Sequence, residues 1–275
     1  MDSPGGPAEG LTANHLQSPT NSARQLDHLP SLVRSLNHSP LSPVTTNFVT
    51  VSGVTSIEFF FDPMCPWAFQ TSVWIRRVRA DRDLDIRWRF FSLEEVNRPE
   101  GKRHPWERPL AYGWTPMRVG AWLRRTDNDL CGAWYEACGN ALHVDGRRFY
   151  DETVATELLP SIGAPSSTWR DALDDPTTHD EVRADHDEAV TRHGGFGVPI
   201  IVFPTGRAVF GPVVVPAPTG DEALALWDLT EAYSRINGLY ELKTPKTTDD
   251  LRTIATAFAP YLSAREWQTI QTPAP

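Results

Sequence analysis

The chain has 275 residues, a formal net charge of −9 and 40% hydrophobic residues, which allows one large domain or two small ones. An acidic chain repels nucleic-acid phosphates and anionic lipids, so we expect neither nucleic-acid nor membrane partners. No apolar stretch approaches the roughly 18 residues that a membrane-spanning helix needs. The first residues also lack the basic and apolar regions of a secretory signal. Three cysteines are too few for a disulfide scaffold, which favours a cytoplasmic protein with free thiols.

The two ends of the chain differ in composition from its middle. Residues 1–54 are rich in Ser, Pro, Asn, Thr and Gly, and we expect them to form a disordered N-terminal arm, because they offer little apolar surface to bury. Residues 244–275 are interpreted as a C-terminal tail with one short helix, Thr248–Ala259, which begins at a Thr-Thr-Asp-Asp capping sequence.

A strand, a helix and a second strand are predicted at the start of the folded region. Ile57–Phe61 is a run of β-branched and aromatic residues typical of a buried strand. Pro66 fits the first turn of a helix that continues to about Ala80. Asp85–Phe91 alternates between polar and apolar residues and predicts the second strand.

The next hundred residues, 93–194, are predicted to be mostly helical. Thr115 is the expected N-cap of one helix, with Pro116 at its first position. Thr177–His193 predicts a polar helix that packs on one side only.

Strand patterns then return at Val198–Phe203 and Ala208–Phe210, and Thr219–Ile236 predicts a final helix. The order β-α-β, helical insert, β-β-α predicts an α/β protein with a thioredoxin-like fold and an inserted all-helical domain. The expected thioredoxin-like domain comprises residues 55–92 and 195–243, and the helical insertion comprises residues 93–194.

The candidate catalytic residue is Cys65, which follows a predicted strand and opens a predicted helix. The free N–H groups and dipole of a helix N-terminus stabilise an anion, so we expect a lowered thiol pKa and a nucleophilic thiolate. Pro66 stiffens this turn, and Trp67 offers a flat apolar wall to a substrate. The alternative is a buried and inert cysteine.

Pro199 is the second candidate, because a proline at the start of a central strand removes a hydrogen-bond donor from the sheet. In a thioredoxin-like order, the loop before this strand faces the N-terminus of the first helix. A cis Val198–Pro199 bond would direct backbone groups at a bound disulfide. An ordinary proline at a strand edge is the alternative.

Three motifs together resemble a known family. The sequence FDPMCPW at residues 61–67, FGVP at 196–199 and FGP at 210–212 is similar to the DsbA-like branch of the thioredoxin superfamily. Within that branch it most resembles the actinobacterial mycothiol-dependent nitroreductases, over about residues 55–245. The resemblance implies a small-molecule substrate, a low-molecular-weight thiol such as mycothiol as co-substrate, no metal, and often a homodimer.

The resemblance also implies roles for individual residues. Cys65 corresponds to the family nucleophile, and the residues expected to bind substrate are Pro66, Trp67, Asn97, Val198 and Pro199. One departure concerns Ala68, which stands where the family has a second cysteine. A two-cysteine cycle at this turn is therefore excluded, whereas a monothiol cycle, in which a second small thiol releases a mixed disulfide, is not.

Other candidate residues favour structural interpretations. Cys131 and Cys138 lie seven residues apart and are expected to form a core stripe, with a resolving thiol as the alternative. His143 could aid proton transfer or contact a carbonyl, but a structural role is the favoured interpretation. The histidines at seven-residue intervals in 179–193 favour a solvated helix face over a metal site.

Three functions remain open at this point. The first is a thiol-dependent oxidoreductase of nitro or quinone-like compounds. The second is an enzyme like the kappa-class glutathione transferases and chromene-carboxylate isomerases, which Ala68 favours. The third is a DsbA-like binding protein without turnover.

Overall fold

The computed structural model describes residues 54–265, and residues 1–53 and 266–275 lie outside the described part. The predicted N-terminal arm therefore remains a prediction for all but its last residue. Among the described residues, no helix is both long enough and apolar enough to span a membrane.

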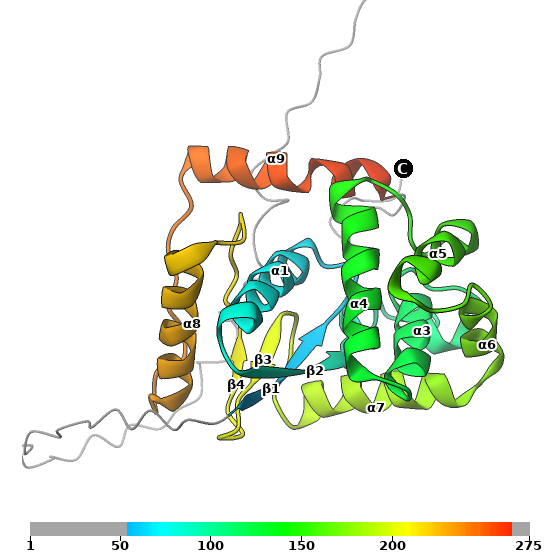
Figure 1. The fold of residues 1–275 in the computed structure, drawn as a ribbon, viewed down its shortest axis with the longest axis horizontal. Coiled ribbons are helices and arrows are strands. Elements are labelled where there is room, and N and C mark those ends of the chain that lie inside the picture. The colour runs from blue at the N-terminus through cyan, green and yellow to red at the C-terminus, as the bar shows by residue number, and fades with distance from the viewer. Residues whose placement is uncertain (1–53, 266–275) are drawn as a thin grey trace, which may run out of the picture. The chain divides into compact units, whose positions relative to one another are not determined.

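Four short strands form one mixed sheet in the order β2-β1-β3-β4 (Figure 1). The strands are β1 (Thr55–Phe61), β2 (Leu84–Phe90), β3 (Ile200–Val202) and β4 (Ala208–Phe210). Strand β1 pairs in parallel with β2 and antiparallel with β3, and β3 pairs antiparallel with β4. This is the strand order of a thioredoxin-like fold, and it confirms the fold class expected from the sequence.

Alternate residues of β1 face different helices, as the two-residue period of a strand requires. Phe59 and Phe61 lie in a core with Trp74 of α1 (Pro66–Asp81) and Trp227 of α8 (Gly220–Arg235). Phe60 faces the opposite side, in a core that also contains Cys65 and is completed by α7 (Thr177–Thr191). Helices therefore cover both faces of the sheet, and the start of α1 lies at the smaller of the two cores.

The region between β2 and β3 is helical, as predicted. Its helices are α2 (Leu93–Val96), α3 (Trp114–Arg124), α4 (Asn128–Gly139), α5 (Glu152–Leu158), α6 (Thr168–Asp174) and α7, with short 3₁₀ turns at η2 (Pro105–Glu107) and η4 (Leu159–Ile162) and a π-helical turn at η3 (Asn140–Val144). A large apolar core lies between these helices and is separate from the two cores at the sheet. Figure 1 shows α3, α5 and α6 grouped beside the sheet domain, with α4 between them and α1.

Two helix boundaries differ from the sequence predictions. Helix α3 begins at Trp114 with Gly113 as its N-cap, so Thr115 is not the N-cap. The Thr115 hydroxyl instead accepts a hydrogen bond from the Ala111 backbone N–H. Helix α9 (Thr248–Ala264) continues five residues beyond the predicted end and contains Pro260 in its interior. Its apolar side is buried, which supports the last turn despite the N–H that proline lacks.

Helix α4 packs closely against the sheet domain because two of its glycines, Gly132 and Gly139, face that domain. A Cβ on Gly132 would lie 2.3 Å from Trp88 Nε1, and one on Gly139 would lie 2.2 Å from Phe69 Cδ2. Phe69 belongs to the first turns of α1, next to Cys65. The close approach at Gly139 therefore helps to fix the part of α1 that carries the thiol.

We predict that Gly139→Ala destabilises the protein by about 1–3 kcal/mol, because the new methyl group overlaps the Phe69 ring in a closely packed core. Urea denaturation measures this change. The control is Asn140→Ala at the exposed residue that follows Gly139, which should change stability by less than about 0.5 kcal/mol. Equal stability of the two variants would contradict the close packing described above.

Candidate active site

Cys65 is the N-cap residue of α1, as the sequence predicted. Its Sγ accepts a hydrogen bond from the Ala68 backbone N–H at 3.4 Å. The thiol also lies 3.7 Å from the carbonyl oxygen of Val198, to which it donates. The turn after β1 and the loop before β3 therefore meet at this sulfur, although they are 133 residues apart in sequence.

The protonation state of Cys65 differs from the sequence expectation. Burial raises the pKa of its thiol to about 12, because only 6% of the residue is exposed and a thiolate would lose its hydration. The N–H groups of Ala68 and Trp67 act in the opposite direction, but the nearby Asp62 carboxyl raises the pKa further. The expectation of a lowered pKa is wrong for this arrangement, in which the neutral thiol dominates at neutral pH.

The neighbours of Cys65 in the motif fill the first turn of α1. Pro66 is the first residue of the helix, as predicted, and the N–H that proline lacks is one that a first-turn residue does not need. Trp67 is half-buried and presents its ring beside the turn. Ala68 is fully buried, so no second thiol is present at the position where a two-cysteine motif would hold one.

The loop before β3 contains a cis proline, which was one of the two possibilities that the sequence left open for Pro199. The Val198–Pro199 peptide bond is cis, and both the Val198 side chain and its carbonyl oxygen lie at the Cys65 core. Asn97 lies on a different segment, at the end of the short helix α2. It is an exposed C-cap residue of α2, and its amide donates to the Leu93 carbonyl oxygen. Its proposed contact with substrate therefore remains a prediction.

Asp62 is a buried carboxyl that the sequence analysis did not single out. Its Oδ1 accepts from the Met64 N–H at 2.9 Å and its Oδ2 from the Leu93 N–H at 2.7 Å, so it joins the Cys65 turn to α2. Burial raises its pKa to about 7, although both backbone hydrogen bonds act to lower it. The signal in the sequence was an acidic residue directly after a buried strand.

His143 supports the same turn from the π-helical segment η3. Its Nε2 lies 2.9 Å from the carbonyl oxygen of Pro63, and because a carbonyl only accepts, Nε2 carries the hydrogen. Burial lowers the His143 pKa to about 4, so the ring is neutral at physiological pH. The ring stacks on Phe69 of α1. These contacts with the Pro63 backbone and the Phe69 ring favour the structural role of His143.

Residues from α9 cover the turn, which the sequence analysis did not predict. The Phe258 ring packs edge-on against Trp67 with centroids 4.8 Å apart, and Tyr261 lies beside His143 at 5.3 Å. Lys246, just before α9, lies 6.0 Å from the Trp67 ring. The i, i+4 and i+7 spacing of Ile254, Phe258 and Tyr261 could have revealed a helix face that needs a partner.

The other two cysteines belong to the core, which confirms their interpretation. Cys131 and Cys138 are fully buried in two different apolar clusters, and burial raises the pKa of both thiols. Cys65 is likewise unpaired, so the structure contains no disulfide among its three cysteines, all of which lie in the described residues.

The histidines of 179–193 are less exposed than predicted. His186 is buried, and its Nδ1 accepts the Ser92 backbone N–H at 3.2 Å. His179 accepts a hydrogen bond from the Trp114 indole. The prediction of a solvated helix face is wrong for His186, because α7 packs against β2 at this position.

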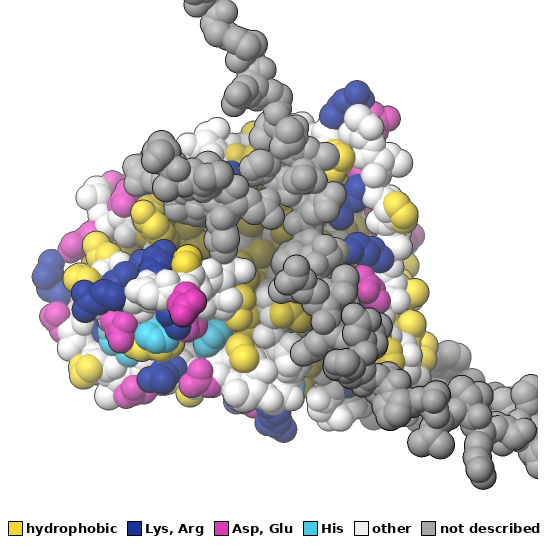
Figure 2. Space-filling model, turned by 180° about the vertical axis from the view of Figure 1, so that it is seen from behind, with side chains coloured by type: hydrophobic (Ala, Val, Ile, Leu, Met, Phe, Trp, Pro, Cys, Tyr) yellow, Lys and Arg dark blue, Asp and Glu magenta, His cyan; other side chains and the backbone are white. Residues whose placement is uncertain are grey.

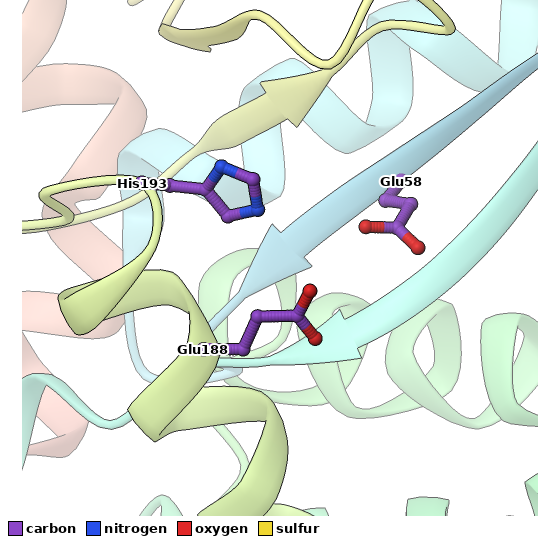
Figure 3. Close-up of side chains that lie close together, drawn as sticks. All are labelled: Glu58, Glu188 and His193. Carbon is purple, nitrogen blue, oxygen red and sulfur yellow. The ribbon is translucent and has the colours of Figure 1, made fainter.

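His193 lies with Glu58 and Glu188 in a group whose ligand atoms are within 4.8 Å of one another (Figure 3). The Arg89 guanidinium already bridges the two carboxylates, lying 2.9 Å from Glu58 and forming a short contact with Glu188. A metal ion would have to displace this cation. We therefore assign the group to an ion-pair network between α7 and the sheet.

Charged side chains of both signs are interspersed on the face drawn in Figure 2 and do not gather by sign.

The sheet order, a cysteine at the start of α1 and helices inserted between β2 and β3 define a DsbA-like member of the thioredoxin superfamily. Residues 64–244 match the family model described as Rv2466c-like, mycothiol-dependent nitroreductase Rv2466c, and the chain belongs to this family. The match ends before α9 begins.

A relative from Mycobacterium tuberculosis (strain ATCC 25618 / H37Rv), the uncharacterised protein Rv2286c, is 49% identical over 217 residues, which are 79% of this chain and 94% of the relative. Among solved structures, the probable DsbA oxidoreductase SCO1869 from Streptomyces coelicolor is 22% identical, with a TM-score of 0.48. The match covers 69% of this chain and 94% of that one. A 2-hydroxychromene-2-carboxylate isomerase is 17% identical, with 66% and 95% coverage and a TM-score of 0.49.

We predict that iodoacetamide labels Cys65 at pH 7 at least about tenfold more slowly than free N-acetylcysteine, because burial keeps the thiol protonated. Mass spectrometry of the alkylated peptide measures the rate. Labelling faster than that of the free thiol would show that the helix terminus outweighs burial.

Asp62 should make stability depend on pH between about 4 and 7. An unfolded Asp ionises near pH 4 and the folded one near pH 7, so the folded state retains a proton that the unfolded state releases. The free energy of unfolding should therefore fall as pH rises through this range, by at most about 1.4 kcal/mol per pH unit.

Asp62→Asn removes this titration, so its stability should lose that slope, whatever its absolute value. Urea denaturation of both proteins at pH 5, 6, 7 and 8 measures the difference. Parallel stability curves for the two proteins would contradict the raised pKa of Asp62.

Proposed function

We propose that the protein is a thiol-dependent oxidoreductase that acts on small molecules through Cys65 alone. The electron donor is a low-molecular-weight thiol, with mycothiol favoured by the family, and the acceptors are nitro or quinone-like compounds. The proposal places this activity in the cytoplasm, where such thiols stay reduced, includes a homodimer, and uses no metal.

The observation that carries the proposal is a single thiol at the start of α1. Cys65 occupies the N-cap position beside the Val198 carbonyl, whereas position 68 holds alanine. Cys131 and Cys138 are buried in separate clusters of the core and are not expected to resolve an adduct. A redox cycle at this turn then requires external thiols.

A monothiol cycle balances with two thiol molecules. For a quinone, the Cys65 thiolate adds to a ring carbon, and one thiol RSH then attacks the Cys65 sulfur. This releases the hydroquinone and leaves Cys65–S–S–R. A second RSH attacks this mixed disulfide, releases RSSR and restores the thiol. The net reaction transfers two electrons and two protons from two RSH to the quinone.

The proposed substrate-binding residues Pro66, Trp67, Val198 and Pro199 belong to the two segments that meet at this sulfur. The ring of Trp67 is the apolar wall for an aromatic acceptor, and Pro66 fixes the turn from which it projects. The Val198–Pro199 segment contributes backbone groups, since the Val198 carbonyl already faces Sγ. Asn97 is kept as a further candidate at the edge of the substrate.

A second candidate is a thiol-cofactor-dependent isomerase or transferase, which Ala68 favours because such chemistry needs no second cysteine. It would convert its substrate in the presence of thiol without net oxidation of that thiol. A binding protein without turnover would bind the thiol or acceptor and leave both unchanged.

Turnover with mycothiol and a quinone or nitroaromatic acceptor tests the proposal. We expect acceptor reduction with formation of thiol disulfide at a ratio of one disulfide per two electrons, and loss of this activity in Cys65→Ser. Conversion without disulfide formation favours the isomerase or transferase, and no conversion favours the binding protein.

The intermediate gives an independent prediction. Incubation with mycothiol disulfide should add one thiol to Cys65, and the adduct should persist until excess free thiol is supplied. Intact-mass spectrometry measures the adduct, and Cys65→Ser is the control.

The variant Ala68→Cys should instead expel the adduct and become two mass units lighter than its reduced form, because the two side chains lie in adjacent positions of one helix turn. An internal disulfide in the native chain would show that Cys131 or Cys138 resolves the adduct, contrary to their assignment as core residues.

A further inference from the structure

Helix α9 forms a roof over the proposed nucleophile. Figure 1 shows it crossing above α1, from the end of α8 towards α4. Phe258 meets the Trp67 ring, and Tyr261 meets His143, so α9 touches both sides of the Cys65 turn. Burial raises the pKa of Tyr261 to about 12, and a negative charge on the nearby Cys65 would raise this pKa further.

In this position α9 blocks the approach of a reactant to the Cys65 sulfur. Disulfide exchange requires the incoming sulfur to approach Sγ directly, and adding an aromatic acceptor requires a ring carbon at the same place. Cys65 is 6% exposed, and the ring of Phe258 lies on the Trp67 ring that a substrate would use. A substrate cannot occupy this place while α9 holds it.

The attachment of α9 is suited to release. The segment that joins it to α8, residues 236–247, contains no helix or strand and is exposed at nearly every position. Within α9 the buried residues are Ile254, Phe258 and Ala264, so a narrow face holds the helix in place. The other end of α9 borders an open groove of about 650 Å³ beside η3 and α5, lined by Gly146, Arg147 and Pro260 among others.

We propose that α9 is a lid that must leave the Cys65 turn before a substrate can reach the sulfur, with residues 236–247 as its hinge. The lid excludes water and thiols from Cys65 in the closed state. Its release rehydrates the sulfur while the N–H groups at the start of α1 stay in place. The purpose of the lid rests on the proposed function, whereas its effect on access to the thiol does not.

A disulfide that pins the far end of α9 tests the lid directly. A Cβ at Gly146 would lie 3.9 Å from Pro260 Cβ, which is the separation that a disulfide needs. The full-length variant Gly146→Cys/Pro260→Cys is oxidised, the crosslink is verified by peptide mass, and Cys65 is labelled with iodoacetamide before and after the crosslink is reduced.

We expect Cys65 labelling to be at least about tenfold slower in the crosslinked form than in the reduced form of the same protein. The control is the single variant Gly146→Cys, which carries the same backbone strain at a φ of +66° but no crosslink, and its Cys65 should label at one rate with and without reductant. Equal Cys65 rates would show that substrates reach the thiol without lid movement and would overturn the proposal.

A second variant loosens the lid instead of locking it. Phe258→Ala removes the contact with Trp67 and should raise the Cys65 labelling rate at least about fivefold, whereas Thr256→Ala on the exposed side of α9 should leave it unchanged. Unchanged labelling in a folded Phe258→Ala protein counts against the lid.

Hydrogen exchange of the unmodified chain provides a measurement that needs no variant. The backbone amides of α9 should exchange faster than those of α4, because a helix of 17 residues that has left its packing partners frays in water without global unfolding. Protection of α9 equal to that of β1 would overturn the proposal. If these tests confirm the lid but turnover survives Cys65→Ser, the lid proposal stands and the proposed function is rejected.

Discussion

The neutral thiol of Cys65 results from two opposing electrostatic effects at one atom. The N–H groups at the start of α1 favour the thiolate, and burial beneath Trp67 and α9 disfavours it. In this structure burial is the larger effect. Removing a charge from water costs several kcal/mol, whereas a helix terminus contributes about 1 kcal/mol, so the order of the two follows from their magnitudes. The state of this sulfur therefore depends on how much solvent reaches it.

Two titratable side chains at the Cys65 turn, Asp62 and His143, carry less charge near neutral pH than they would in water. Asp62 has a pKa of about 7 and His143 one of about 4, both because of burial. Each holds the turn through backbone atoms, Asp62 by accepting two N–H groups and His143 by donating to the Pro63 carbonyl. The turn is thus fixed by hydrogen bonds that do not require an ion pair near the sulfur.

In the described structure, histidine and carboxylate side chains occur in two separate groups with different roles. His143 lies against the candidate site, while Glu58, Glu188 and His193 surround Arg89, whose guanidinium lies over the Phe60 ring. The second group stabilises the packing of α7 on the sheet edge through a buried guanidinium with several carboxylate partners. Glu58, Glu188 and His193 resemble a set of metal ligands, but the Arg89 guanidinium already neutralises the two carboxylates.

Local sequence was sufficient for the elements and for the position of Cys65. The apolar run at 57–61, Pro66 at a helix start and the strand signals after residue 197 depend on neighbours in the chain, so their patterns predicted β1, α1 and β3. Family resemblance supplied the significance of Ala68. The protonation of Cys65 was decided only in the tertiary structure, because burial of one sulfur depends on Val198 and on Phe258, which lie 133 and 193 residues further along the chain. Desolvation adds up over everything that surrounds an atom in space, and a sequence pattern records only what lies beside it along the chain.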